Sequence, residues 1–147
     1  MSQRETNING TSDQSCRCGS GLQQWENISG NRAGVSAIYQ TVAGNDSITM
    51  DIMIGYGQVS ETGIYLSGRK LAGISGSQNG IYLGTNDKLK GKELVIQTLV
   101  HDIQKETNRT NVMFALRGGK QELYEDMGFE VQSDGEVVLY TVKVLFC

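Results

Sequence analysis

The stretch 88-KLKGKELVIQTLVHDIQKETNRTNVMFALRGGKQELYEDMGF-129 decides the fold that this sequence predicts. A basic turn opens it, and apolar residues then recur at the spacing of a helix with one broad apolar face. These apolar residues are Leu94, Val95, Ile96, Leu99, Val100 and Ile103. The pattern predicts a helix that packs on a sheet.

The basic turn is a candidate anion site. It contains Lys88, Lys90, Gly91 and Lys92, directly before the predicted helix. The first turn of a helix has unpaired backbone N–H groups and a partial positive charge. A glycine there lets a ligand approach the backbone, and the three ammonium groups add positive charge, so the turn can hold a pyrophosphate. The alternative is a solvated loop without a ligand.

A strand and a second helix are predicted after the first helix. The apolar run at 111–116 is strand-like, and Gly118 and Gly119 break it. Residues 120–127 are expected to form a short helix that ends at Gly128, a residue suited to a left-handed C-cap. Phe129 then begins another extended segment.

This order of elements resembles the GNAT superfamily of N-acetyltransferases. In that family an acyl-CoA-binding motif (Gln or Arg, two residues, Gly, one residue, Gly or Ala) stands directly before a helix. The next helix often ends in Tyr-x-x-x-Gly-Phe. Here 88-KLKGKE-93 stands at the first motif and 124-YEDMGF-129 matches the second. The resemblance implies an α/β (α+β) fold, a GNAT-like mixed and mostly antiparallel sheet flanked by helices.

The resemblance also implies acetyl-CoA as the cofactor and an amine as the acceptor. Tyr124 would lie beside the departing thiolate as the proton donor. The residues that the resemblance places at the cofactor are Lys88, Lys90, Gly91, Lys92, Glu93 and Leu94. Two features depart from an active enzyme. Glu93 puts a carboxylate where the family has a small residue, and 81–84 contains no Asp or Glu to deprotonate the amine.

The remaining segments predict one helix and several strands. Residues 33–44 carry apolar side chains at helical spacing, whereas 48–54, 63–66, 70–74 and 80–83 are short apolar runs between glycine-containing turns. Those short runs predict an antiparallel meander. Asp134-Gly135 between extended runs predicts a hairpin into a long last strand at 136–146. The core side chains of that strand are either the alternate set Val138, Tyr140, Val142 and Val144 or the set between them.

The composition is that of one ordinary domain. With 147 residues and a net charge of −3, the chain gives no general case for binding nucleic acid or an anionic membrane. No apolar run approaches the roughly 20 residues that span a bilayer, and MSQRETNING is not a signal peptide. We expect a cytoplasmic protein, or one in an assembly formed in the cytoplasm. Residues 1–31 predict a flexible or partner-ordered arm, and 32–147 the domain.

The cysteines do not predict a metal site. Cys16 and Cys18 are two possible thiolate ligands, but a structural zinc site needs four ligands. The only other residues of that kind are His101 and Cys147, and Cys147 is expected to be an unpaired thiol.

Two function classes follow from the sequence. The first is an acyl-CoA-dependent N-acyltransferase that uses the lysine-rich turn and Tyr124. The second is a catalytically silent GNAT-like structural or binding protein, for example a virion component that docks to a protein partner through its polar arm. The 124-YEDMGF-129 signature favours the first class, whereas Glu93 and the missing base favour the second.

Overall fold

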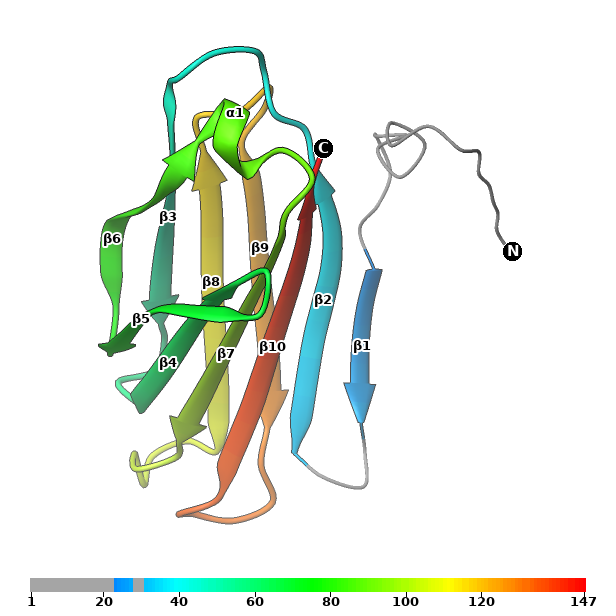
Figure 1. The fold of residues 1–147 in the computed structure, drawn as a ribbon. Coiled ribbons are helices and arrows are strands. Elements are labelled where there is room, and N and C mark those ends of the chain that lie inside the picture. Colours follow the sequence, from blue (N-terminus) through cyan, green and yellow to red (C-terminus); the bar gives the residue numbers. More distant parts are fainter. Residues whose placement is uncertain (1–22, 28–30) are drawn as a thin grey trace.

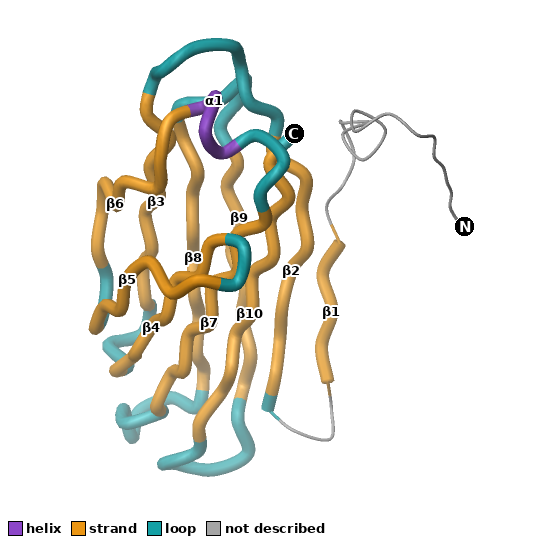
Figure 2. Tube along the Cα trace, in the orientation of Figure 1, coloured by secondary structure: helices purple, strands orange, loops and turns teal. Residues whose placement is uncertain are grey.

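Two β-sheets face each other across one hydrophobic core in the computed structural model, which describes residues 23–27 and 31–147 (Figures 1 and 2). Most of the predicted arm, including Cys16 and Cys18, lies outside the described residues. The described part contains ten strands and one short helix, α1 (Asn86–Leu89).

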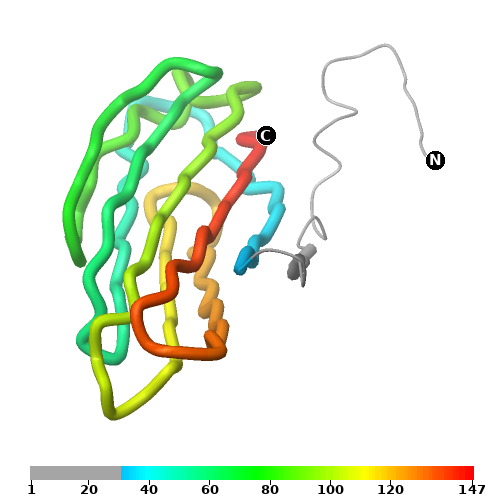
Figure 3. Tube along the Cα trace, turned by 90° about the horizontal axis from the view of Figure 1, so that it is seen from below, coloured from blue at the N-terminus to red at the C-terminus, as the bar shows by residue number. Residues whose placement is uncertain are grey.

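The larger sheet has six strands, in the order β1-β2-β10-β7-β4-β5. Their bounds are β1 Gln23–Asn27, β2 Arg32–Tyr39, β10 Val137–Phe146, β7 Glu93–His101, β4 Val59–Leu66 and β5 Arg69–Ser75. Neighbouring strands are antiparallel except β2 and β10, which are parallel. Seen from below, β10 (red) lies between β7 and β2 (Figure 3).

The smaller sheet has four antiparallel strands, in the order β6-β3-β8-β9. Their bounds are β6 Gln78–Thr85, β3 Ser47–Ile54, β8 Arg109–Arg117 and β9 Leu123–Glu130. Ile48, Met50 and Ile52 of β3 are fully buried and meet core side chains such as Val138 and Tyr140 of β10. The domain is therefore a β-sandwich.

The predicted α/β fold flanked by helices is wrong, because the long helix expected after the basic turn is the strand β7. Leu94, Ile96, Thr98 and Val100 are buried and alternate with more exposed residues, which is the period of a strand. The buried Thr98 shares a 2.9 Å hydrogen bond with the Thr62 hydroxyl of β4, so a polar residue occupies a core position.

Three further predictions of local structure are also wrong. The helix expected at 33–44 is the strand β2, and the helix expected at 120–127 is a turn followed by β9. Asp134-Gly135 does not form a hairpin, because it joins β9 of the smaller sheet to β10 of the larger one. Asn31, which precedes β2, and Ser133 of that loop donate hydrogen bonds to Glu136 and lower the pKa of its carboxyl group.

Other predictions of strands are confirmed. Strands occupy 48–54, 63–66, 70–74, 80–83 and 111–116, and the last strand runs from Val137 to Phe146. The set Val138, Tyr140, Val142 and Val144 is the buried one, at 0–2% exposure. The predicted meander holds for β4 and β5, but β6 pairs with β3 in the other sheet.

The prediction that Cys147 is an unpaired thiol is wrong, because Cys147 is disulfide-bonded. Its partner lies outside the described residues. Within the described residues, no helix is long and apolar enough to cross a membrane.

Candidate ligand-binding face

The solvent-facing side of the four-stranded sheet carries the ion pairs of Arg117 and two exposed tyrosines. Because Ile48, Met50 and Ile52 point into the core, the side chains between them point outward. We call this surface the outer face. It consists of Thr49, Asp51, Met53, Tyr82, Met113, Ala115, Arg117, Tyr124 and Asp126.

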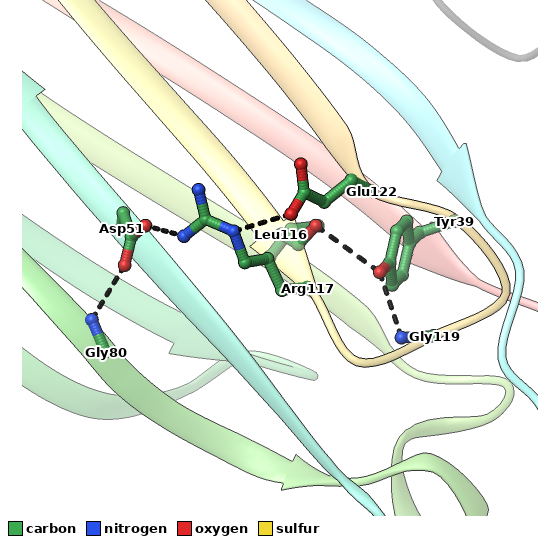
Figure 4. Close-up of polar contacts among 7 residues, drawn as sticks. All are labelled: Tyr39, Asp51, Gly80, Leu116, Arg117, Gly119 and Glu122. Atoms are coloured by element: carbon green, nitrogen blue, oxygen red, sulfur yellow. Dashed lines mark hydrogen bonds and ion pairs between the residues drawn. The ribbon is translucent and has the colours of Figure 1, made fainter.

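A chain of polar contacts crosses the outer face (Figure 4). Arg117 of β8 forms an ion pair with Asp51 of β3 through one terminal nitrogen, and its Nε donates to Glu122 Oε2 at 2.7 Å. The other oxygen of Asp51 accepts a 2.7 Å hydrogen bond from the Gly80 N–H of β6. The Arg117 side chain is 47% exposed, so a ligand can reach the guanidinium group.

The turn after β8 fixes the position of Arg117 and Glu122. Gly118 has φ +106°, and a Cβ there would lie 2.0 Å from the Ser47 carbonyl oxygen. The buried Tyr39 of β2 accepts a 3.0 Å hydrogen bond from Gly119 N–H and contacts the Leu116 carbonyl oxygen at 3.4 Å. Burial raises the pKa of Tyr39, although the Gly119 hydrogen bond lowers it, so the phenol is a stable donor.

Two exposed tyrosines stand on either side of this polar centre. Tyr82 on β6 and Tyr124 on β9 are each 58% exposed. Tyr82 pairs with Thr49 on β3, and Tyr124 pairs with Ala115 on β8. The two tyrosines belong to the outer strands of the four-stranded sheet, so three interstrand spacings of about 4.8 Å separate them across the sheet. Their rows are also two residues apart along the strands, because Tyr82 aligns with Thr49 and Tyr124 with Ala115, so their backbones lie roughly 16 Å apart.

The side chain of Tyr124 leans across the sheet rather than standing away from it. Its hydroxyl donates to the Met113 sulfur of β8 at 3.0 Å. Ala115 points outward between Arg117 and Met113 but is only 3% exposed, because longer neighbours cover it. A tyrosine in this position presents a flat aromatic surface next to the Arg117 network.

The sequence-predicted site residues are not brought together. Lys88 belongs to α1, a helix of four residues, Lys90, Gly91 and Lys92 follow it in the exposed connection to β7, and Glu93 is the exposed first residue of β7. Leu94 is fully buried in the core. Lys92 lines a hollow of about 400 Å³ with Leu66, Ser67, Arg69 and Leu71 of the larger sheet. Tyr124 lies on the outer face of the other sheet, on β9.

Among the described residues, no group of three or more His, Cys, Asp or Glu side chains is placed to hold a metal ion. The family models, the curated proteins and the solved structures that we compared with this chain gave no match. The outer face must therefore be interpreted from its own chemistry.

Of the residues on the outer face, only Tyr124 was predicted from the sequence as a site residue, and for a different role, whereas Tyr82 and Arg117 were not. A signal for Tyr82 was present, because in 80-GIYL-83 the apolar Ile81 and Leu83 alternate with Tyr82. Alternation puts Tyr82 on the opposite side of the strand from the core. No local pattern indicates that Arg117 pairs with Asp51, since these residues are 66 positions apart in the chain.

Proposed function

We propose that this protein is a non-catalytic binding module that holds a neutral carbohydrate chain on the outer face. The observation that carries the proposal is the pair of exposed tyrosines, Tyr82 and Tyr124, on either side of the Arg117 ion-pair network. This proposal develops the binding-protein alternative of the sequence analysis, without its GNAT-like fold.

The chemistry of the outer face matches that of a sugar chain. A sugar ring has an apolar C–H surface, which packs on the flat side of an aromatic ring, and hydroxyl groups at its rim. Arg117 supplies a planar group with five N–H donors, two of which are engaged with Asp51 and Glu122, and the carboxylates of Asp51 and Glu122 supply acceptors. Hydrogen bonds to charged groups of this kind are stronger than those between neutral groups.

A protein partner fits the centre of the outer face less well. The cores of protein interfaces are depleted of Asp, Glu and Lys, although Tyr, Met and Arg are enriched there, so the carboxylates Asp51 and Glu122 are the residues that count against a protein partner. Covering the Asp51–Arg117–Glu122 network with an apolar partner surface would carry a desolvation cost. Sugar hydroxyl groups avoid that cost, since they replace the hydrogen bonds of the displaced water.

The charge of the face favours a neutral ligand. With the turn at 118–122 counted, four carboxylates (Asp51, Glu122, Asp126 and Glu130) and three cationic groups (Arg109, Arg117 and Lys120) lie on this side of the sheet or at its edge, which gives a net charge of −1. Acidic polysaccharides would be repelled by this excess of carboxylates. The roughly 16 Å between the backbones of the two tyrosines also requires an extended ligand rather than a single sugar.

Acyl transfer stays a prediction, but the long helix on which it was based does not form. The pyrophosphate was expected at the start of a long helix, but the residues after the basic turn form the strand β7. The four residues of α1 give no comparable helix end.

Binding to a panel of neutral polysaccharides tests the proposed function. We suggest soluble β-glucan, xylan, mannan and α-glucan in affinity gels, followed by calorimetry with the oligosaccharides of the polymer that binds. Tyr82→Ala and Tyr124→Ala should each weaken binding by about 5- to 30-fold, because truncating a central aromatic contact costs about 1–2 kcal/mol. Leu99→Ala, at a 38% exposed residue of β7 in the larger sheet, is the control and should bind normally.

Absence of binding to every neutral polysaccharide would overturn the proposal. So would equal binding by wild type and the Tyr82→Ala/Tyr124→Ala double variant. Binding to an acidic polysaccharide or to a protein alone would replace the proposed ligand class with another.

A further inference from the structure

A hollow continues the outer face toward its lower end. It has a volume of about 280 Å³ and is lined in part by Tyr56, Arg109, Asn111, Gly128 and Glu130. Gly128 follows Tyr124 by four residues on β9, so the two lie on the same side of the strand about 13 Å apart. The hollow is therefore continuous with the proposed carbohydrate surface.

Tyr56 is held over this hollow in an unfavourable backbone conformation. Its φ is +57°, in the left-handed region that bulky side chains rarely adopt, and it is 50% exposed. Such residues persist only where the surrounding structure enforces them, and they are concentrated at functional sites.

The loop that carries Tyr56 is fixed at both ends. The Gly55 N–H donates to the Asn111 carbonyl oxygen at 3.0 Å. The buried Gln58 side chain donates to Asp102 Oδ1 at 2.7 Å and accepts the Ile103 N–H at 2.8 Å. These contacts hold Tyr56 at the surface, where its side chain forms a wall of the hollow.

Gly128 forms the open floor of the hollow. A Cβ at Gly128 would approach only the Thr110 carbonyl oxygen, at an ordinary 3.7 Å, and its φ is not positive. The backbone therefore does not require glycine here. What the missing side chain provides is space.

We infer that this hollow binds the terminal unit of the carbohydrate chain, so that the protein recognises a chain end. The inference rests on the proposed function. A volume of about 280 Å³ is below the usual 300–1,000 Å³ of sites for drug-sized ligands and suits one sugar ring. Arg109 and Glu130 pair across the strands and line the hollow, so they offer a donor and an acceptor to its hydroxyl groups. Tyr56 lies in the loop past the end of β3 and lines the hollow at this end of the sheet, so we expect it to limit the chain there.

Filling the hollow tests the inference. Gly128→Val adds a side chain that strands favour, so the variant should fold, and it should weaken binding at least tenfold. The probe is a length series of oligosaccharides from the neutral polysaccharide that wild type binds. If chain ends are recognised, inhibition at equal mass should fall as chain length rises, because longer chains offer fewer ends.

A second variant tests whether the Tyr56 side chain contributes to binding in a protein that is not destabilised. Tyr56→Gly should raise the midpoint of thermal unfolding, because glycine adopts positive φ freely, and should weaken binding at least fivefold. Ser67→Gly is the matched control, because Ser67 is the other described non-glycine residue with positive φ, at +49° between β4 and β5. It should raise the midpoint without changing binding.

The outcomes distinguish the two proposals. If no neutral polysaccharide binds wild type, both are overturned. If Tyr82→Ala and Tyr124→Ala weaken binding but Gly128→Val binds normally, or if inhibition follows mass rather than the number of chain ends, only the chain-end inference is overturned.

Discussion

Each sheet of the sandwich has a hollow in which a tyrosine stands beside a glycine, but the two hollows differ in what fills them. On the larger sheet Gly63 of β4 pairs with Gly73 of β5 under Tyr65. A Cβ at Gly63 would lie 3.0 Å from two atoms of the Tyr65 side chain. The protein therefore uses that space for its own side chain.

The hollow of the smaller sheet is left open. Tyr56 forms its wall from a fixed loop, and the space above Gly128 is free of side-chain contacts. Tyr65 has no unusual backbone angle, whereas Tyr56 has φ +57°. A glycine that a neighbouring side chain covers serves packing. A glycine with free space above it, beside a strained aromatic residue, marks a candidate binding site.

Gly118→Ala should destabilise the protein most, by about 4 kcal/mol. The added Cβ overlaps the Ser47 carbonyl oxygen at 2.0 Å, and φ +106° is itself unfavourable for alanine. Because this turn positions Arg117 and Glu122, carbohydrate binding should be lost as well. Urea denaturation followed by fluorescence measures the free energy of unfolding. A change below about 1 kcal/mol would mean that the turn does not constrain the outer face as described.

Gln58→Ala should cost about 3 kcal/mol and should affect only the hollow of the smaller sheet. The change leaves Asp102 Oδ1, the Arg109 carbonyl oxygen and the Ile103 N–H without their Gln58 partner. The Tyr56 loop then loses its anchor, so affinity for the chain end should fall in the remaining folded protein.

Gln97→Ala is the control for Gln58→Ala, because Gln97 is an exposed glutamine of β7. Calorimetric binding and urea denaturation of both variants give the comparison. Normal binding by stable, folded Gln58→Ala protein would show that the Tyr56 loop holds its conformation without this anchor.

The strands differ in how well the sequence predicted them. The strands at 48–54 and 136–146 were predicted because buried apolar residues alternate with others there. In β7 the signal failed, since Val95 and Leu99 are apolar on the outward side and Thr98 is polar in the core. As a result, the apolar residues of β7 recur at the spacing that is typical of a helix. In β9 the charged Glu125 occupies a buried position, so apolar and polar residues do not alternate regularly there either.

The candidate site was predicted less well than the strands. Tyr124 was singled out for a motif that belongs to a different fold. The outer face depends on which strands are neighbours, and the order β6-β3-β8-β9 joins segments distant in the chain. Local residue patterns carry no direct information on that order. The strain at Tyr56 also depends on contacts of Gln58 with residues 44 or more positions away.

Tyr39→Phe should cost about 1–2 kcal/mol, because the phenol no longer satisfies Gly119 N–H and the Leu116 carbonyl oxygen. The variant should also differ in its pH dependence. The pKa of Tyr39 is raised in the folded protein, chiefly by burial. Its contribution to stability is thus fully present below the unfolded pKa of about 10 and is lost as pH rises through the folded value.

Urea denaturation between pH 7 and pH 11 checks the Tyr39 prediction. Wild type should lose stability at the alkaline end more steeply than Tyr39→Phe. Parallel curves would mean that ionisation of Tyr39 is not linked to folding.

The smallest effects compare the two glycines directly. Gly63→Ala should destabilise by about 1 kcal/mol, because its Cβ displaces the Tyr65 ring from the surface that the ring covers. Gly128→Ala should instead stabilise by about 0.5–1 kcal/mol, since alanine loses less backbone freedom on folding and meets only an ordinary contact. Opposite signs in urea denaturation would support the distinction between a filled and an open hollow. Destabilisation by Gly128→Ala as large as that by Gly63→Ala would show that both glycines serve packing and that Gly128 is not an open floor for a sugar.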